Sequence, residues 1–126
     1  MSFFKRDKGF KDIYSLKERE NESRRILCKY PSYVPVIVEL DKKLGELQKQ
    51  KFLVPGDVCM SHLLFSVRKH IKNMNQSTAL FIFVDGSIIS PTQMLNVVYD
   101  TYKKNKKDET GDLFLYVNIA AENTFG

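Results

Sequence analysis

The sequence of 126 residues is 43% hydrophobic and 28% charged, which fits one compact domain with a single core. Nine Phe and six Tyr exclude a disordered chain, and no apolar run reaches the roughly 18 to 20 residues that span a bilayer. Most of the net charge of +5 lies at the N-terminus, because residues 1–30 hold nine Lys or Arg against five Asp or Glu. Such a basic segment suits nucleic acid, anionic lipid or an acidic protein, although a solvated helix face is commoner.

A helix is predicted over residues 15–30. Ser15 is suited to be its N-cap, and Glu18, three residues further on, completes a capping box. Pro31 ends the helix, because the residue before a proline avoids the helical region. The apolar stripe is narrow, so we expect the helix to dock along one edge only. Its members are Leu16, Ile26, Leu27 and Tyr30.

Two strands are predicted next, over residues 33–40 and 51–55, and they pair naturally as a hairpin. Residues 41–50, between them, form a polar, lysine-rich connection. Both faces of the first strand are largely apolar, whereas a strand with one solvated face alternates apolar and polar residues. Another element must therefore cover Pro35 and Ile37, and the N-terminal helix is the nearest candidate along the chain.

The main helix is predicted from a broad stripe of apolar residues at helical spacing, which suits packing on the sheet. The stripe consists of Met60, Leu63, Leu64, Val67 and Ile71. A short buried strand is then expected over residues 80–84, followed by a turn at Asp85-Gly86 and an edge strand at Ile88-Ile89.

A last helix is predicted from Met94 to Tyr102, with Thr92 as its cap. A mostly apolar strand follows over residues 113–119, and residues 120–126 form a small, polar tail. The order helix, strand, strand, helix, strand, strand, helix, strand matches an α+β fold, the β-grasp, with an added N-terminal helical region.

The motifs of the common enzyme classes are absent from the sequence. No Gly-x-Gly-x-x-Gly or Walker loop occurs, and His62 and His70 are eight residues apart without a His-Glu-x-x-His element. Cys28 and Cys59 lack Cys-x-x-Cys spacing, so buried thiols in a reducing, cytoplasmic setting are favoured over a zinc site. We therefore expect no catalytic residue, no metal and no cofactor, and we favour a binding or modifier protein.

Several short motifs, in order along the chain, carry a resemblance to a known family. They are Lys29-Tyr30-Pro31 with residues 34–39, then residues 51–55, Val67-Arg68-Lys69, residues 81–84, Pro91-Thr92 and Phe114-Leu115-Tyr116 leading into residues 122–126. From about Phe10 to Gly126 the chain resembles the ubiquitin-like modifiers of autophagy, the family of GABA type A receptor-associated protein and microtubule-associated protein light chain 3.

The resemblance implies a ubiquitin-like β-grasp protein that is conjugated and is not an enzyme. Activating, conjugating and processing enzymes would join the carboxylate of Gly126 to phosphatidylethanolamine, which places the cytoplasmic protein on the autophagosome membrane. Gly126 suits this role because a residue without Cβ can thread a narrow enzyme channel. The implied organisation is a basic extension at 1–9, a helical region at 10–30, the core at 31–120 and a conjugation tail at 121–126.

The resemblance also implies that autophagy receptors and adaptors bind through aromatic-x-x-aliphatic peptides, as an extra strand beside residues 51–55. The pocket for the aromatic side chain would be formed by Glu22, Ile26, Pro35, Ile37, Lys51, Leu53 and Phe114. The pocket for the aliphatic side chain would be formed by Phe52, Val54, Pro55, Val58 and Leu63. Without the resemblance, plain core packing explains these apolar residues equally well.

The chain departs from the family pattern near these pockets. Ser66 replaces a leucine of the aliphatic pocket, and His70 and Tyr33 each replace an arginine. Cys59 replaces a threonine cap. Peptide selectivity is therefore the property that transfers least from the family to this chain.

Two alternatives remain open from the sequence. The first is a small basic RNA-binding α/β domain, suggested by the sequence pI of about 9.2, although the basic residues cluster near the N-terminus and not among the strand aromatics. The second is a ubiquitin-like adaptor that is never conjugated, which differs from the favoured interpretation only in the fate of Gly126.

Overall fold

The computed structural model describes residues 9–72, 74, 78–106 and 110–121. Most of the predicted basic extension at 1–9, nearly all of the predicted tail at 121–126 and the conjugation residue Gly126 lie outside the described residues. The helices are α1 (Phe10–Ile13), α2 (Leu16–Lys29), the short 3₁₀ helix η1 (Lys42–Leu44), α3 (Met60–Arg68) and α4 (Leu95–Lys104). The strands are β1 (Tyr33–Leu40), β2 (Glu46–Leu47), β3 (Lys51–Pro55), β4 (Ile71–Lys72), β5 (Leu80–Val84), β6 (Ser87–Ile89) and β7 (Leu115–Ala121).

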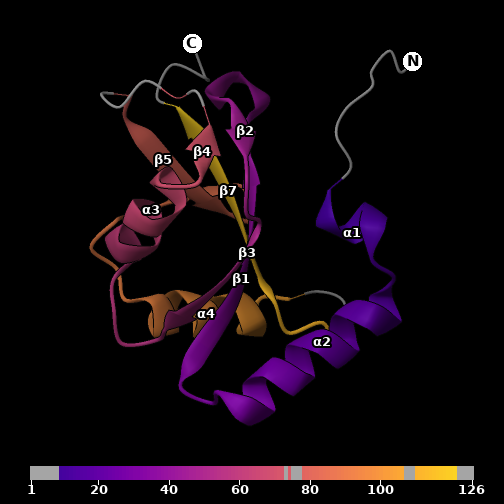
Figure 1. The fold of residues 1–126 in the computed structure, drawn as a ribbon. Helices are drawn as coiled ribbons and strands as arrows, with labels where there is room; N and C mark the ends of the chain where they lie inside the picture. The colour runs from indigo at the N-terminus through magenta and orange to yellow at the C-terminus, as the bar shows by residue number, and fades with distance from the viewer. Residues whose placement is uncertain (1–8, 73, 75–77, 107–109, 122–126) are drawn as a thin grey trace.

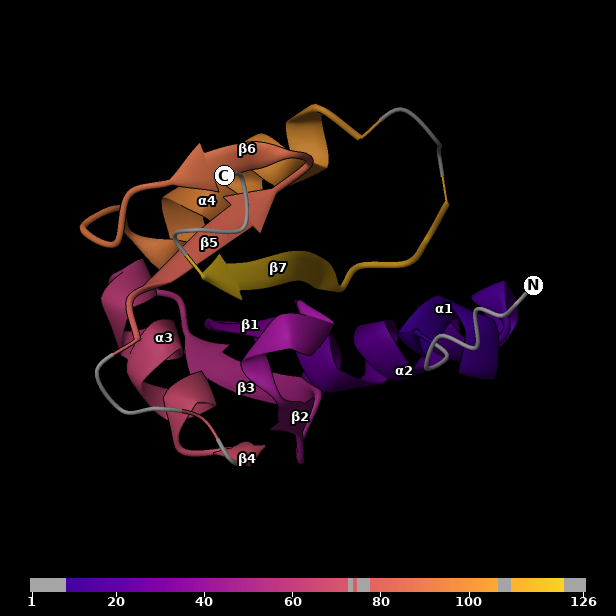
Figure 2. The same ribbon diagram turned by 90° about the horizontal axis from the view of Figure 1, so that it is seen from above.

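Five strands form one mixed sheet in the order β3-β1-β7-β5-β6. β1 runs parallel to β7, and the other three pairs are antiparallel. α3 and α4 lie on one side of this sheet, and α1 and α2 lie on the other (Figures 1 and 2). The α+β, β-grasp order with an N-terminal helical region is thus confirmed.

Each face of the sheet has its own apolar cluster. The larger cluster joins β1, β3, β5 and β7 to α3 and α4, with Met60, Leu63 and Leu95 fully buried at its centre. The smaller cluster lies on the opposite face, where α1 and α2 cover β1 and the chain just before β7. It consists of Phe10, Ile26, Ile37 and Phe114. The prediction that the N-terminal helix covers Ile37 is therefore confirmed.

The local signals for α2 and for the hairpin are also confirmed. The Ser15 side chain accepts a hydrogen bond from the Glu18 N–H, and the Glu18 carboxylate accepts one from the Ser15 N–H, which is the predicted capping box. α2 ends at Lys29, before Pro31. β1 and β3 have the predicted bounds and pair antiparallel, with Pro35 opposite Leu53.

Three predictions about element ends are wrong. Thr92 does not cap α4, because the helix begins after Met94 and the Thr92 side chain bonds to Ser90. Ile71 is not in α3, because the helix ends at Arg68 and Ile71 pairs with Leu47. The last strand runs from Leu115 to Ala121 and not over 113–119, so it includes residues 120 and 121 of the segment 120–126 predicted to be a polar tail.

Two further predictions are wrong. The connection at 41–50 is not only a loop, because it holds η1 and β2, and β2 pairs with β4. Gly45 lies between η1 and β2 with a φ of 123°, and a Cβ at this position would lie 2.5 Å from the Lys72 carbonyl oxygen.

Cys28 is not buried, because its position on α2 faces solvent. The predicted stripe of that helix is narrower still, since Ile26 is buried but Leu16 is 40% exposed.

Candidate functional site

β3 is the edge strand of the five-stranded sheet, and in the described part of the chain it pairs with β1 alone. The backbone groups on its outer edge are therefore available to an added strand. Successive side chains of a strand point to opposite faces. Lys51 and Leu53 face α2, whereas Phe52 and Val54 face the core beneath α3. The site has two halves, one on each side of β3.

The half that faces α2 is bounded by an ion pair. Lys51 Nζ donates to the Glu22 carboxylate at 2.9 Å, and Arg25 donates to the same carboxylate at 3.0 Å. The hydrogen bond from Arg25, and then that from Lys51, hold the pKa of Glu22 below its usual value. Lys51 lies opposite Ile37 across the hairpin, and Glu22 lies one helical turn before Ile26. The ion pair therefore lies beside the smaller apolar cluster.

The predicted residues of the aromatic pocket meet here, but they differ in accessibility. Leu53 is 39% exposed, whereas Ile37 and Phe114 are fully buried and Ile26 is 9% exposed. Pro35 is buried on β1. Leu53 and the Glu22–Lys51 pair therefore form the accessible surface of this half. The other apolar residues of the predicted pocket are buried, and we call them the floor of this half: Ile26, Pro35, Ile37 and Phe114.

Phe10 closes the cluster from the side of β7, and sequence reasoning missed it. Its ring lies 5.4 Å from that of Phe114 in an edge-on arrangement, and its side chain is 6% exposed. The Tyr14 ring lies 4.8 Å from the Phe10 ring. A four-residue helix has too few positions to show helical periodicity, so no pattern in the sequence pointed to this contact.

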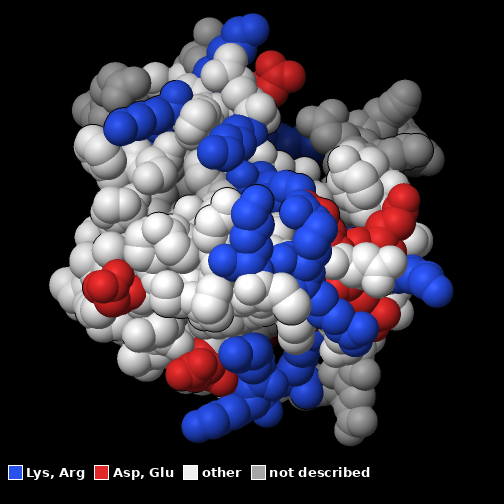
Figure 3. All heavy atoms as spheres, turned by 60° about the horizontal axis from the view of Figure 1, so that its bottom comes forward, with Lys and Arg blue, Asp and Glu red and all other residues white. Residues whose placement is uncertain are grey.

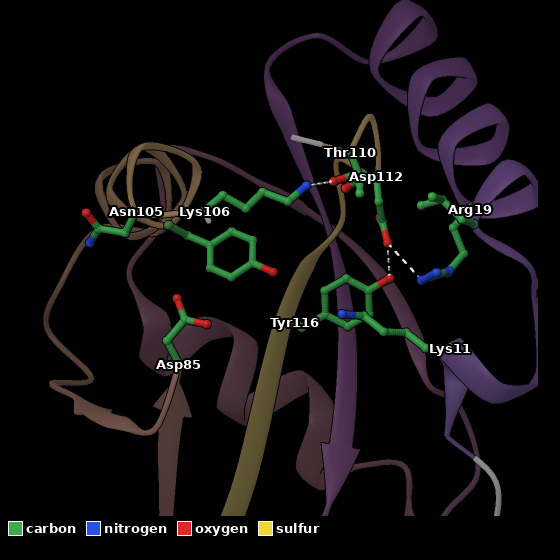
Figure 4. Close-up of a pocket in the computed structure, with 10 residues that line it drawn as sticks. Lys11, Arg19, Asp85, Asn105, Lys106, Thr110, Asp112 and Tyr116 are labelled. Atoms are coloured by element: carbon green, nitrogen blue, oxygen red, sulfur yellow. Dashed lines mark hydrogen bonds and ion pairs between the residues drawn. The ribbon is translucent and has the colours of Figure 1, made fainter. Parts of the chain in front are cut away.

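A buried carboxylate holds Phe114 in place, and it too was missed. Asp112 Oδ1 accepts a hydrogen bond from the Phe114 N–H at 3.2 Å. Asp112 Oδ2 accepts one from Arg19 at 3.3 Å and one from the Tyr116 hydroxyl at 2.5 Å (Figure 4). Burial, reinforced by Asp112, raises the pKa of Tyr116, so the phenol keeps its proton. This network ties α2 to β7 beneath the aromatic half of the site.

The half that faces α3 is a groove with a basic lining. Three of the predicted aliphatic-pocket residues line it, namely Phe52, Val54 and Pro55. Leu63 is fully buried in the core, Val58 packs against that core, and neither lines the groove. The remaining lining residues are Lys49, Leu53, His62, Ser66, Lys69 and His70. We call these nine residues the basic groove.

Other kinds of site find no support in the described ranges. Within residues 9–72, 74, 78–106 and 110–121, no group of three or more His, Cys, Asp or Glu is placed to hold a metal ion. No helix of that same part of the chain is long and apolar enough to cross a membrane. A hydrogen bond with Ser61 lowers the pKa of the Cys59 thiol, but no described acid or base partner gives that thiol a reaction to perform.

Comparisons with known proteins agree on one family. The family model described as autophagy protein Atg8, ubiquitin-like, matches residues 18–126. Autophagy-related protein 8 of Schizosaccharomyces pombe is 39% identical over 119 residues, 93% of each chain. Autophagy-related protein 8e of Arabidopsis thaliana is 40% identical over 127 residues, 99% of this chain and 93% of that one. The crystal structure of Trypanosoma brucei Atg8 superimposes with a TM-score of 0.78 at 28% identity, covering 96% of this chain and all of that one.

Proposed function

The chain belongs to the Atg8 family of ubiquitin-like autophagy proteins, and from this premise we propose that it is a conjugated modifier that recruits peptides to β3. Conjugation joins the Gly126 carboxylate to the amine of phosphatidylethanolamine, in reactions that other enzymes catalyse. The chain itself performs no catalysis. It moves between the cytoplasm and the autophagosome membrane according to whether it carries the lipid.

The observation that carries peptide recruitment is the free edge of β3 with an apolar floor on one side and a groove on the other. A peptide added as a strand satisfies the backbone groups of this edge, and its alternate side chains reach the two sides in turn. An aromatic side chain on the α2 side lies against Leu53 and, once the Glu22–Lys51 pair opens, against Ile26 and the cluster below. The partners are autophagy receptors and adaptors that carry such a peptide.

The conjugation proposal is tested by reconstitution. The protein is incubated with the activating and conjugating enzymes of the family, ATP and vesicles that contain phosphatidylethanolamine, and the product is analysed by mass spectrometry. We expect a lipid adduct on Gly126 and none on a Gly126→Ala variant. If Gly126→Ala is lipidated as well as wild type, this glycine is not the conjugation site.

The recruitment proposal is tested by titrating one aromatic-x-x-aliphatic peptide while strand amide shifts are followed by NMR. Leu53→Ala removes accessible apolar surface worth about 1 to 2 kcal/mol, so we expect roughly 5- to 30-fold weaker binding. Val97→Ala is the matched control, because Val97 is also exposed, at 52%, but lies on α4. If wild type, Leu53→Ala and Val97→Ala bind the peptide equally well and the amide shifts lie away from β3, the residues of the predicted pockets have a purely structural role.

A further inference from the structure

The cavity drawn in Figure 4 lies beside β7, two strands away from β3 in the sheet. Its volume of about 810 Å³ is in the range of cavities that hold small molecules. Its walls come from α1, α2, the turn between β5 and β6, the end of α4 and the chain that leads into β7. Apart from Leu16, each residue that lines it has a polar side chain. We call the cavity formed by the residues of Figure 4 the polar cavity.

One end of the polar cavity gathers basic side chains around Asp112. Arg19 of α2 donates to the Asp112 carboxylate at 3.3 Å, and Lys106 Nζ donates to the Asp112 backbone carbonyl. Lys11 Nζ of α1 lies 4.4 Å from the centre of the Tyr116 ring, whose hydroxyl donates to the same carboxylate. Neither lysine forms an ion pair with another described residue. Because Arg19 balances the charge of Asp112, the charges of the two lysines are in excess.

These basic groups also keep N–H donors that no described residue accepts from. The guanidinium of Arg19 has five N–H groups, and its hydrogen bonds to Asp112 and to the Ser15 carbonyl use two of them. An ammonium group has three N–H groups, and Lys106 uses one of them. The basic end can therefore donate several hydrogen bonds to a single anion.

The other end of the polar cavity holds a carboxylate. Figure 4 shows Asp85 and Asn105 on the side away from Arg19 and Lys11. Asp85 begins the two-residue turn of the β5–β6 hairpin with a φ of 52°, a left-handed conformation that Asp tolerates better than most residues. In the ranges that the structure describes, its carboxylate forms no hydrogen bond and no ion pair. The polar cavity is thus positive at one end and negative at the other.

We propose that the polar cavity binds a small aminoalkyl phosphate, with the phosphate between Lys11 and Lys106 and the primary ammonium group at Asp85. Such a ligand is either a free phosphate ester of an amino alcohol or the headgroup of a phospholipid, and the chemistry of recognition is the same for both. The binding is non-covalent. It requires neither Gly126 nor β3, so its failure would leave the proposed function intact.

Charge complementarity at both ends supports this ligand. A phosphate ester has several acceptor oxygens in a tetrahedral arrangement, so it accepts charge-assisted hydrogen bonds from Lys11, Lys106 and Arg19 together. The ammonium group has three donors, which suit the Asp85 carboxylate and the side-chain oxygen of Asn105. An anion without an amine would be repelled by Asp85. An uncharged ligand would displace water from both ends without replacing its hydrogen bonds.

The test compares O-phosphoethanolamine with molecules that lack one of its parts. Ethyl phosphate lacks the amine, ethanolamine lacks the phosphate, and β-alanine has a carboxylate in place of the phosphate. Each is titrated into the full chain while backbone amide signals are followed by NMR. We expect O-phosphoethanolamine to bind about 10-fold more tightly than each of the other three. It should shift the amide signals of Asp85, Lys106 and Tyr116.

Two variants test the two ends of the polar cavity separately. Lys106→Gln should weaken O-phosphoethanolamine and ethyl phosphate alike, by about fivefold, because both carry the phosphate. Asp85→Asn should weaken O-phosphoethanolamine by about fivefold and leave ethyl phosphate unchanged or slightly tighter, because a repelling charge is removed. Lys11→Gln repeats the test of the basic end at an exposed residue that makes no hydrogen bond to Asp112. Thermal unfolding checks that each variant is folded.

The outer surface is basic as well, so the test needs a control for net charge. Figure 3 shows Lys and Arg side chains in a nearly continuous band down the middle and bottom of one face. Lys104→Gln is the matched control, because Lys104 is an exposed lysine of α4 that does not line the polar cavity. We expect it to bind O-phosphoethanolamine as wild type does. If it weakens binding as much as Lys106→Gln, the effect is one of net charge and the site is overturned.

A short-chain phospholipid with the same headgroup separates the two sources of the ligand. Binding as tight as that of O-phosphoethanolamine assigns the polar cavity to a lipid headgroup, and binding about 10-fold weaker assigns it to the soluble ester. If ethyl phosphate or β-alanine binds as tightly as O-phosphoethanolamine, the ligand is not an aminoalkyl phosphate. If none of these molecules shifts the amide signals around the polar cavity, the proposal is wrong.

Discussion

Lys51 of β3 donates to the Glu22 carboxylate of α2 at 2.9 Å, and this contact crosses from the edge strand to the helix beside the floor of the aromatic half. An aromatic side chain that reaches Ile26 and Ile37 must enter between α2 and β3, where the pair now lies. The two charges are half-exposed, at 46% for the Lys51 side chain and 30% for that of Glu22. A pair of this kind is worth only about 0.2 to 1 kcal/mol, so a ligand can displace it.

We expect Glu22→Gln to tighten the binding of a peptide that has an aromatic residue and uncharged flanks. The substitution keeps the shape of the side chain and weakens its bond to Lys51, so the ligand no longer competes with an ion pair. The gain is at most about fivefold, which corresponds to the upper value for an exposed pair. Isothermal titration calorimetry against wild type measures it.

Lys51→Ala separates the two roles of the pair. It also removes the ion pair, but in addition it removes the cation that acidic flanks of a peptide would meet. We therefore expect it to weaken an acidic-flanked peptide and to leave an uncharged one unchanged or slightly tighter. Weaker binding of both peptides by Glu22→Gln would show that the ion pair supports the site instead of closing it.

The same carboxylate makes stability depend on pH. Because Arg25 and Lys51 lower the pKa of Glu22 in the folded state, the unfolded state binds its proton more readily. The stabilisation that the ionised Glu22 adds to the folded state is present above the usual Glu pKa of about 4.3, and it is lost as pH falls through the lowered folded-state pKa. Urea unfolding from pH 7 to pH 3 should show the difference between wild type and Glu22→Gln shrinking toward zero, and a difference that stays constant over this range would contradict the prediction.

Much of the fold could be predicted because its signals are local. The capping box needs only Ser15 and Glu18, and the alternation of β3 is contained in residues 51–55. The end of α3 could not be predicted in this way, because Ile71 fits a helical stripe and leaves it only to pair with distant Leu47. Local periodicity does not record such a competition between elements.

The candidate site, too, could be predicted only in part. The resemblance placed Leu53 and Lys51 beside α2, but it did not indicate that Phe10 would close the cluster from the other side. Asp112 is equally invisible in the sequence, since its partner Arg19 lies 93 residues away. On the α3 side, no sequence rule separated Leu63, which is fully buried, from Ser66, which lines the basic groove.

We expect the N-terminal charge to assist membrane association. Removing residues 1–8 leaves in place Gly9, whose N–H donates to Asp12 at the start of α1, but deletes Lys5, Arg6 and Lys8. Co-sedimentation with anionic vesicles should weaken on truncation, and wild-type binding should fade with salt because exposed charges are screened over about 8 Å at physiological ionic strength. Vesicles of neutral lipid are the control. Unchanged binding after truncation would make these residues a solvated extension only.

The buried pair of Arg19 and Asp112 should be among the most costly contacts to break. Their side chains are 11% and 4% exposed, and Asp112 also holds the Phe114 N–H and the Tyr116 hydroxyl. Arg19→Met leaves the carboxylate buried without its cation, which costs about 3 kcal/mol or more for a pair of this kind. Urea unfolding measures the loss, and Lys103→Gln is the control, since the Lys103 side chain is 44% exposed and its ion pair with Asp100 lies on the surface of α4.

A double-mutant cycle then shows whether the pair acts as a unit. Arg19→Met should cost much less in a chain that already carries Asp112→Asn, because the amide has no charge that needs a buried partner. The coupling should also reach the site, since Asp112 fixes Phe114, which packs in one cluster with Ile37, the residue opposite Lys51 of β3. The amide signals of β3 should therefore shift in Arg19→Met but not in Lys103→Gln. Additive losses of stability, or a loss in Arg19→Met no larger than that in Lys103→Gln, would mean that the network does not hold α2 against β7.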